Sequence, residues 1–452
     1  MPSSPSQASP LLVRLAELAH QAGAGTEWRP RAALHMLDWL GCAARGVDSA
    51  QGRSFGLWLQ QQGGGDRPTL AGRHADAAAA AAYHGALGSV LEMDDIHRSS
   101  ILHPGPVVIP AVLAAAPAST NGARLLAGVL AGYEAVIRVG RALGPSHYGM
   151  WHSTATAGCF GAAAGAAVVL GLDVAATAHA MALAGTRGGG LWQVRHESSL
   201  GKSWHMAGAA RDGVAAAQLA ASGLTGPLAV LEGPSGWFAA TAPQADASLV
   251  LEPRGRPWLE DVSFKPWPAC RHAHPAMDGL RECLRGTGLL AGDVATVQVA
   301  TYADALRFCD RPLPLDEAQA RFSIQHALAA WLLWGEPRFE HYAAEAIRDP
   351  ALAALRARVS VRLGEAQQAR YPLHYGATVR IECHDGRVLA ADLQDCWGDP
   401  DRPMPEAAVR DKARGLMTHA GWCPGRVDAA LAAVEALPLA SDLTALERAL
   451  LP

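Results

Sequence analysis

Four side chains able to carry or move a proton lie within ten residues near the middle of the chain. They are Lys265, Arg271, His272 and His274. Pro266 and Pro268 forbid a regular helix at the start of this segment, because proline lacks an N–H and biases the preceding residue toward extended geometry. A stiff cationic stretch suits the wall of an anion-binding cleft. Taken alone, it is also typical of a solvated basic loop.

A second polar group lies between two apolar segments and contains three acids, two histidines and an arginine. Its members include Glu92, Asp94, Asp95, Arg98 and His103. An adjacent acid pair near a histidine would suit a divalent metal, since hard cations prefer oxygen ligands. The alternative is that Asp94 and Asp95 cap the helix expected near Val107, or pair with Arg98. Two adjacent acids on a helix also occur in isoprenoid synthases, but that class needs a further acid one turn on, where this chain has Arg98 and Ser99. We therefore predict no metal site.

Two further polar stretches each precede an apolar helix. His152 is followed by Ser153, Thr154 and Thr156, and Lys202 stands at the start of another expected helix. Hydroxyl side chains are good N-caps, and the N–H groups at a helix start favour an anionic ligand. Capping alone would explain the hydroxyls, and a lone histidine is more often structural.

Composition limits the functional classes. The net charge is −4, from 38 basic and 42 acidic residues, so nothing indicates nucleic acid or an anionic membrane as a partner. The eight cysteines never form a C-x-x-C or zinc spacing, and no signal-peptide pattern stands at the N-terminus. We therefore expect reduced thiols in a cytoplasmic protein. The longest stretch without Asp, Glu, Lys or Arg, 142–172, contains histidines and glycines and is predicted to be a buried helix.

Hydrophobic spacing predicts two kinds of domain. Up to about residue 260 the pattern is almost entirely helical, with helices expected within 11–45, 75–91, 107–116, 124–143, 157–170, 175–184 and 204–222. Strands are predicted at 296–301, 357–363, 377–383 and 388–393, and helical spacing returns at 323–334 and after 405. The fold class is a large all-α domain built from both chain ends, 1–262 and 399–452, with a smaller α+β domain inserted at 263–398.

Taken together, seven motifs resemble the MmgE/PrpD family in order and spacing from about residue 10 to 450. They are Glu92-Met-Asp-Asp, His103-Pro-Gly-x-x-x-Ile-Pro-Ala, His152-Ser-Thr-Ala-Thr-Ala-Gly, Lys202-x-x-His-x-x-x-Ala-Ala-x-x-Gly, Phe264-Lys-Pro-Trp-Pro-x-Cys-Arg-His-x-His, Arg321-Phe-Ser-Ile-Gln and Gly398-Asp-Pro-x-x-Pro-Met. Each motif alone is weak, but seven in register are specific. The family includes 2-methylcitrate dehydratase, cis-aconitate decarboxylase and iminodisuccinate epimerase.

The resemblance implies a helical domain with an inserted α+β lid, a homodimer, and an active site between the domains without an obligatory metal or organic cofactor. It implies a small anionic carboxylate as substrate. The catalytic residues that it implies are Asp94, His103, His152, Lys202 and Lys265. The substrate-binding residues are Ser153, Arg271, His272 and His274.

The chemistry of such enzymes explains these residue types. Cations must neutralise a polycarboxylate, because an uncompensated carboxylate in a closed cleft is costly. A base then removes a proton from the carbon next to a carboxylate, and histidine suits this step because its ordinary pKa lies near neutrality. We expect a cofactor-independent lyase, either a hydro-lyase or a decarboxylase. The alternatives are an isomerase or epimerase of a small dicarboxylate, and a catalytically silent small-acid binding protein.

Overall fold

The chain divides into two compact units in the computed structural model, which describes residues 9–197 and 199–451. Unit 1 comprises Met1–Val90, Asp94–Val262 and Glu406–Pro452. Unit 2 comprises Ser263–Pro405 together with the short segment Leu91–Met93. The first and the last described segments therefore both belong to unit 1, and unit 2 takes three residues from within the unit 1 sequence.

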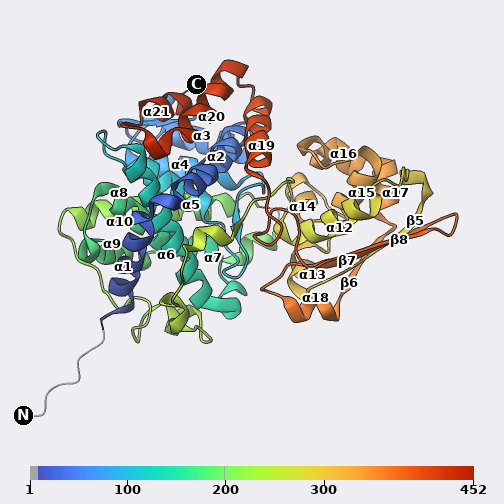
Figure 1. Ribbon diagram of the computed structural model, residues 1–452, viewed down its shortest axis with the longest axis horizontal. Coiled ribbons are helices and arrows are strands. Elements are labelled where there is room, and N and C mark those ends of the chain that lie inside the picture. Colours follow the sequence, from blue (N-terminus) through green and yellow to red (C-terminus); the bar gives the residue numbers. More distant parts are fainter. Residues whose placement is uncertain (1–8, 198, 452) are drawn as a thin grey trace, which may run out of the picture. The chain divides into compact units, whose positions relative to one another are not determined.

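Unit 1 is built mainly of α-helices (Figure 1). They are α1 (Leu11–Ala24), α2 (Arg29–Gly46), α3 (Ala50–Gln60), α4 (Ala77–Ser89), α5 (Gly105–Ala115), α6 (Gly122–Tyr148), α7 (Ser153–Thr156), α8 (Gly158–Leu170), α9 (Val174–Gly185), α10 (Lys202–Ala221), α11 (Trp237–Thr241), α19 (Glu406–His419), α20 (Pro424–Glu435) and α21 (Thr444–Leu450). The helices predicted from hydrophobic spacing are confirmed, and the boundaries of most lie within about three residues of those expected. The helical spacing expected within 11–45 corresponds to two helices, α1 and α2, and the prediction missed α3 and the short α11.

Three short strands within the first 260 residues were not expected either. β1 (Arg67–Thr69) and β2 (Arg73–Ala75) form an antiparallel hairpin, and β3 (Ile96–His97) is two residues long. β4 (Val262–Ser263) spans the boundary between the units. Such strands are too short for an alternating pattern to appear in the sequence.

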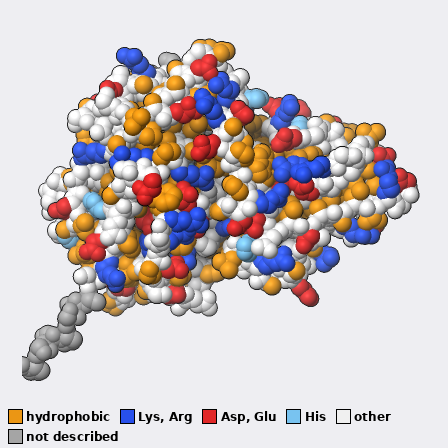
Figure 2. Space-filling model, viewed as in Figure 1, with side chains coloured by type: hydrophobic (Ala, Val, Ile, Leu, Met, Phe, Trp, Pro, Cys, Tyr) orange, Lys and Arg blue, Asp and Glu red, His pale blue; other side chains and the backbone are white. Residues whose placement is uncertain are grey.

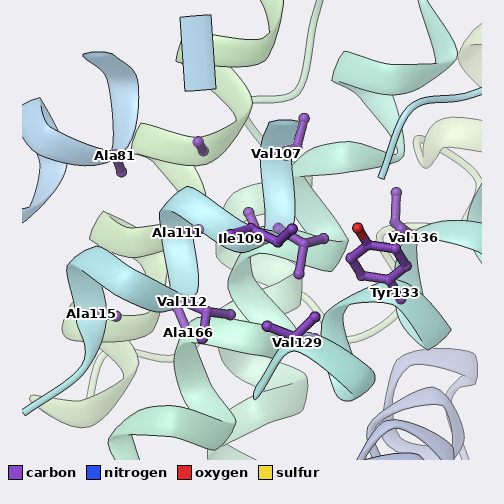
Figure 3. Packing of buried hydrophobic residues seen from close by; sticks show 14 of the residues in the cluster. Ala81, Val107, Ile109, Ala111, Val112, Ala115, Val129, Tyr133, Val136 and Ala166 are labelled. Atoms are coloured by element: carbon purple, nitrogen blue, oxygen red, sulfur yellow. The ribbon is translucent and has the colours of Figure 1, made fainter. Parts of the chain in front are cut away.

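The core of unit 1 is filled by small and β-branched side chains from α5, α6 and α8. Figure 3 shows Val112 of α5 beside Val129 of α6, and Ile109 of α5 on the side of Tyr133 of α6; each of these side chains is fully buried. On the face drawn in Figure 2, acidic and basic side chains are interspersed, as expected from the small net charge. Helices lined by Ala and Gly can approach closely, so the backbone itself becomes part of the packing.

Two pairs of glycines bring α6 and α8 into backbone contact. A Cβ added to Gly128 would lie 2.9 Å from the carbonyl oxygen of Gly165, and one added to Gly165 would lie 2.8 Å from that of Gly128. Gly132 and Gly161 face each other in the same reciprocal way, at 2.8 Å in both directions. Glycines four residues apart on each helix thus form one contact strip, where any side chain would force the helices apart.

The helical stretch Ser153–Leu170, which includes α8, is the one in the described residues that is long and apolar enough to cross a membrane. In the structure 89% of it is buried inside the protein. This is the environment of a core helix, in agreement with the buried helix predicted for 142–172.

Unit 2 contains a four-stranded sheet in the order β6-β5-β7-β8. Its strands are β5 (Val294–Thr301), β6 (Val359–Leu363), β7 (Ala377–Cys383) and β8 (Val388–Leu393). β5 pairs parallel with β6 and antiparallel with β7, and Gly386, at φ 87°, lies in the turn between the antiparallel strands β7 and β8. All four strands lie where the sequence predicted them.

The α-helices α12 to α18 accompany this sheet and are labelled in Figure 1. They are α12 (His274–Leu284), α13 (Ala303–Cys309), α14 (Glu317–Arg321), α15 (Ile324–Trp334), α16 (Ala344–Arg348), α17 (Pro350–Arg356) and α18 (Glu365–Arg370). α12 packs on β7 and β8, and a Cβ added to its Gly279 would lie 2.7 Å from the side chain of Val379. Unit 2 is therefore an α+β unit, and α12 carries the end of the cationic segment.

The glycine strip makes a prediction about stability. Replacing Gly161 with Ala would put a Cβ 2.6 Å from that of Val136, so Gly161→Ala should lower the free energy of unfolding by about 1–3 kcal/mol. Gly208 in α10 has no atom within 4 Å of an added Cβ, so Gly208→Ala should be neutral or stabilise by up to about 1 kcal/mol. Urea unfolding of both variants checks this. Equal effects of the two substitutions would contradict close helix contact at Gly161.

Candidate active site

His103 is held in one tautomer by the residues just before α5. Its Nδ1 lies 3.0 Å from the backbone oxygen of Asp95 and 2.8 Å from Oδ2 of Asp94. Both partners are acceptors, so Nδ1 carries the proton and, in the neutral ring, Nε2 has the lone pair. The backbone N–H of His103 donates to Oγ1 of Thr154 at 3.1 Å. A histidine oriented in this way can accept a proton at Nε2.

Asp95 joins three elements through its carboxylate. Oδ2 accepts from Nδ1 of His35 in α2 at 2.8 Å and from the hydroxyl of Tyr133 in α6 at 2.6 Å. Oδ1 accepts from the backbone N–H of Gly105, the first residue of α5, at 2.9 Å. Asp95 therefore accepts from the first N–H of α5, as the capping alternative supposed, although the N-cap residue of this helix is Pro104. A Cβ at Gly105 would lie 2.7 Å from Oδ1, so this contact depends on glycine.

Burial controls the ionisation of this group. It raises the pKa of Asp95 to about 6; the Tyr133 hydroxyl and the Gly105 N–H oppose the shift, and the neighbouring Asp94 carboxylate adds to it. Burial also holds the pKa of His35 well below its ordinary value, and the cations Arg31 and Lys412 lower it further. His35 is thus a neutral donor to an Asp95 carboxylate at neutral pH.

His152 is buried and pairs with a second histidine. Its Nδ1 lies 3.1 Å from Nδ1 of His205, and its ring lies against Trp192 with the ring centroids 4.3 Å apart. Burial lowers the pKa of His152 well below the ordinary value, and Lys202, His205 and His103 lower it further. The pKa of His205 is lowered to about 4 by burial and by Lys202. Both rings are therefore neutral at pH 7, and a single proton lies between the two Nδ1 atoms.

Unit 1 thus brings four of the predicted catalytic residues together. Asp94 is beside His103, and both His103 and Lys202 act electrostatically on His152. Lys202 is the first residue of α10 and His205 lies one turn later. The predicted Ser153 is buried as the first residue of α7, next to His152. This cluster holds one carboxylate, one cation and three imidazoles, of which those of His152 and His205 are neutral at pH 7.

The hydroxyls after His152 do not cap a helix, contrary to the capping expectation. The N-cap of α7 is His152 itself, and no side chain caps this end. Oγ1 of Thr154 instead accepts from the N–H of His103, and Oγ1 of Thr156 lies 2.7 Å from Nε2 of His147. The hydroxyls therefore orient histidines.

Lys265 lies in unit 2, where its side chain is fully buried. Its Nζ is 3.5 Å from Oε2 of Glu92, which belongs to the same unit. Glu92 has φ 54°, in the left-handed region that a residue with a side chain adopts at a cost of about 1–3 kcal/mol. We infer that the surrounding structure maintains this backbone conformation because it places the Glu92 carboxylate beside Lys265.

Arg271 forms a buried ion pair with Asp399 in unit 2. Both side chains are at most 1% exposed, and Asp399 also accepts from the hydroxyl of Ser263 at 2.7 Å. A second guanidinium nitrogen donates to Nδ1 of His274 at 3.2 Å, and Nε2 of His274 donates to the backbone oxygen of Ala269 at 3.1 Å. The charge of Arg271 and both ring nitrogens of His274 therefore have partners within the unit.

His272 is packed in an aromatic box. Its ring is parallel to those of Phe308 and Tyr375, with centroids 5.2 and 5.4 Å away, and Nδ1 lies 2.9 Å from the hydroxyl of Tyr302. The side chain is buried. These contacts are those of a core histidine, the alternative that sequence reasoning attaches to any single histidine.

The acid pair at Asp94 and Asp95 is not part of a metal-ligating group among the described residues. One such group exists there, formed by His374, Asp395 and Asp401 of unit 2, whose ligand atoms lie within 4.8 Å of one another. Nδ1 of His374 is 2.9 Å from both carboxylate oxygens of Asp395. None of these three residues was predicted to take part in catalysis.

Sequence reasoning missed five residues around His103 and His152. They are His35, Asp38, Tyr133, His205 and Lys412. Only His205 carried a signal, because a spacing of three from Lys202 places it on the same helix face. His35, Asp38 and Tyr133 stand singly in apolar helices, where spacing indicates burial and nothing about partners.

Comparison with known proteins matches both parts of the chain to one family. The MmgE/PrpD N-terminal domain matches residues 13–250, and the MmgE/PrpD C-terminal domain matches residues 267–434.

Three relatives illustrate the range of similarity. A cis-aconitate decarboxylase-like protein (oryM) of Aspergillus oryzae is 26% identical over 75% of this chain and 75% of its own length. The cis-aconitate decarboxylase of Mus musculus is 25% identical over 66% of this chain and 62% of its own. The mitochondrial 2-methylcitrate dehydratase of Yarrowia lipolytica is 30% identical over 49% of this chain and 45% of its own. The chain thus spans three quarters of the first of these proteins and less than two thirds of the other two.

The internal partners of Arg271 make a testable prediction. Arg271→Leu leaves Asp399 buried without its cation, which should cost about 3–5 kcal/mol of stability. Arg271→Leu combined with Asp399→Asn removes both charges and should recover most of that loss. Urea unfolding of the three proteins measures it. A single variant as stable as the wild type, with only a raised KM, would instead assign the guanidinium to substrate.

Proposed function

Since the chain belongs to the MmgE/PrpD family, we propose that it is a lyase that removes a proton next to a carboxylate of a small tricarboxylate. The relatives named above support this class, because one is a cis-aconitate decarboxylase and another a 2-methylcitrate dehydratase. Their identity to this chain, 25–30%, supports the reaction class and leaves the particular acid open.

The observation that carries the proposal is the arrangement at His103 and His152. Nδ1 of His103 holds its proton against the Asp95 carbonyl and the Asp94 carboxylate, which leaves Nε2 as a proton acceptor. His152, whose pKa burial holds well below its ordinary value, is a neutral imidazole on which His103 acts electrostatically. An oriented imidazole, a neutral imidazole and a lysine suit proton abstraction and proton return better than they suit passive binding of an acid.

Lysine supplies the charge that the substrate requires. Lys202, at the start of α10, is the cation of unit 1 that acts on both His152 and His205. We propose that Lys202 and Lys265 bind substrate carboxylates, each charge-assisted hydrogen bond contributing on the order of 1.5–3 kcal/mol. Arg271, paired with Asp399, is assigned to holding the segment that carries Lys265.

The proposed step moves one proton and one electron pair. A neutral imidazole takes the proton from the carbon next to a carboxylate, and the electron pair of that C–H bond passes toward the carboxylate. Lys202 stabilises the resulting negative charge. In a dehydration the pair then forms the C=C bond as hydroxide leaves, and an acid donates a proton to that oxygen to give water.

The experiment that tests this function is incubation of the purified protein with citrate, 2-methylcitrate and cis-aconitate in D2O. Proton NMR follows exchange of the hydrogen next to the carboxylate and the appearance of olefinic product, and released CO2 is measured in parallel. Product with water loss identifies a dehydratase, and CO2 release identifies a decarboxylase.

Two other outcomes correspond to the alternatives. Exchange without net product, seen with a dicarboxylate such as iminodisuccinate, would indicate an epimerase. Binding measured by calorimetry without exchange of any acid would indicate a silent binding protein and would overturn the proposed lyase.

The roles proposed for unit 1 predict the effect of two substitutions. Lys202→Ala and His152→Ala should each lower kcat by about 100- to 10,000-fold, because each removes a group that acts in the transition state. His74→Ala is the matched control, since His74 is exposed on β2. Initial rates with the substrate found above provide the measurement. A Lys202→Ala protein with nearly wild-type turnover contradicts the mechanism.

Chelation tests whether a metal takes part. We expect prolonged EDTA treatment to leave turnover unchanged, because lysine and histidine can supply the charge and the proton transfer that the step requires. Asp401→Asn serves as control for the His374, Asp395 and Asp401 group, whose loss should not alter kcat. Activity that is lost to EDTA and restored by a divalent cation would refute a metal-independent reaction.

A further inference from the structure

Lysine is rare in this chain. Of the 38 basic residues only three are lysines, at positions 202, 265 and 412, and all others are arginines. Two of the three are the cations proposed to bind substrate. Arginine and lysine are not equivalent, because the guanidinium is a planar fork and the ammonium a compact point charge. The position of the third lysine therefore requires a physical explanation.

Lys412 is buried in α19 against α2. Its Nζ lies 2.6 Å from Oδ1 of Asp38, and the two side chains are 6% and 1% exposed. Asp38 stands three residues after His35 on α2, so the two side chains share one face of the helix. His35 donates to Asp95, whose backbone oxygen holds the Nδ1 proton of His103. Lys412 is thus connected to His103 through Asp38, the α2 face and Asp95.

The buried carboxylates along this route repel one another. Burial raises the pKa of Asp38 to about 6; Lys412 opposes the shift, and the charges of Asp95 and Asp94 add to it. Asp95 is raised to a similar pKa, again mainly by burial. Three carboxylates this close and this buried do not all remain ionised without nearby positive charge.

Within the described part of unit 1, charged and titratable groups from four segments interact with these carboxylates. They are Lys412 of α19, Arg31 and His35 of α2, Tyr133 of α6, and His103 before α5. His35 is neutral, and Arg31 also interacts with Glu260 and Glu406. Lys412 is therefore the cation most directly committed to this carboxylate array.

We propose that Lys412 is a positioning residue of the active site, whose charge keeps Asp38, Asp94 and Asp95 ionised together so that His103 retains its Nδ1 proton. The inference rests on the proposed function only in taking His103 as a reacting group. With the array ionised, the Asp95 carbonyl accepts from Nδ1, and the Asp94 carboxylate lies 2.8 Å from the same nitrogen as its ion-pair partner. Without the ammonium, one carboxylate takes up a proton at a higher pH, and the orientation of His103 weakens.

The pH dependence of kcat/KM shows in which direction removal of the Lys412 charge moves the protonation of the carboxylates. The wild type should lose activity below about pH 6, where Asp38 and Asp95 become protonated. This loss of activity at low pH is the acid limb of the pH profile. Lys412→Met removes the cation and should move the acid limb to higher pH by about one unit, so that kcat/KM falls about tenfold at a pH below the new limb. Asp38→Asn leaves Lys412 without its anion and should move the limb downward. The double variant, neutral at both positions, should return it close to the wild type.

Two further variants separate positioning from simple structural support. Lys412→Arg keeps the charge and should keep the acid limb in place. Arg414→Met removes an exposed cation from the same helix, paired with Asp428 at 2.7 Å, and should leave both the limb and kcat/KM unchanged. If Lys412→Met fails to fold, the opposite shift in Asp38→Asn and its reversal in the double variant carry the test. An acid limb that stays in place in every folded variant overturns the proposal.

A readout independent of turnover distinguishes this proposal from the proposed function. Long-range 1H–15N correlation spectra of the histidine rings, with His103 assigned from His103→Gln, report the tautomer directly. The wild type should show the Nδ1–H form at pH 7, and Lys412→Met should show a mixture. The same tautomer in both proteins overturns the inference even if Lys202→Ala abolishes turnover, and the expected change supports it even if no acid is turned over.

Discussion

Unit 1 depends on the burial of one carboxylate, that of Asp95. The two carboxylate oxygens accept hydrogen bonds from His35 of α2, from Tyr133 of α6 and from the first N–H of α5. The backbone oxygen of Asp95 accepts from Nδ1 of His103. A buried carboxylate is costly unless hydrogen bonds and charges compensate it, and here each bond comes from a different element. The same contacts that make the burial tolerable also position an imidazole. Helix packing and proton chemistry therefore share one set of hydrogen bonds.

The glycine strip between α6 and α8 complements that arrangement. Because Gly128 and Gly132 lie against Gly165 and Gly161, the two helices meet through their backbones and leave little freedom to slide. α6 presents Tyr133 to Asp95, and α8 follows directly after the segment that contains His152 and Thr154. Small residues thus fix the relative position of the two imidazoles without making any contact with them.

Hydrophobic spacing in the sequence was sufficient for most of the long helices of unit 1, α3 excepted, and for the four main strands of unit 2, since both depend on local periodicity. The sequence motifs also indicated Asp94, His103, His152 and Lys202, which the structure brings together. The closeness of polar residues in the sequence predicted their side-chain partners less well than the motifs predicted the site residues of unit 1. Arg271 and His272 are close in sequence to Lys265, yet one faces Asp399 and the other an aromatic box. Partners such as Lys412, far away in the sequence, leave no local pattern at all.

The connection of α19 to α2 has a consequence for the order of events during synthesis. Lys412 follows Asp38 by 374 positions, and a ribosome adding about 5–20 residues per second needs roughly 20–75 s to make that stretch. During this interval α2 exists without the cation that neutralises its buried acid. A nascent chain can therefore form most of the helices of unit 1 while Asp38 is still protonated or exposed to solvent. The charge arrangement around His103 is complete only after Lys412 has been made.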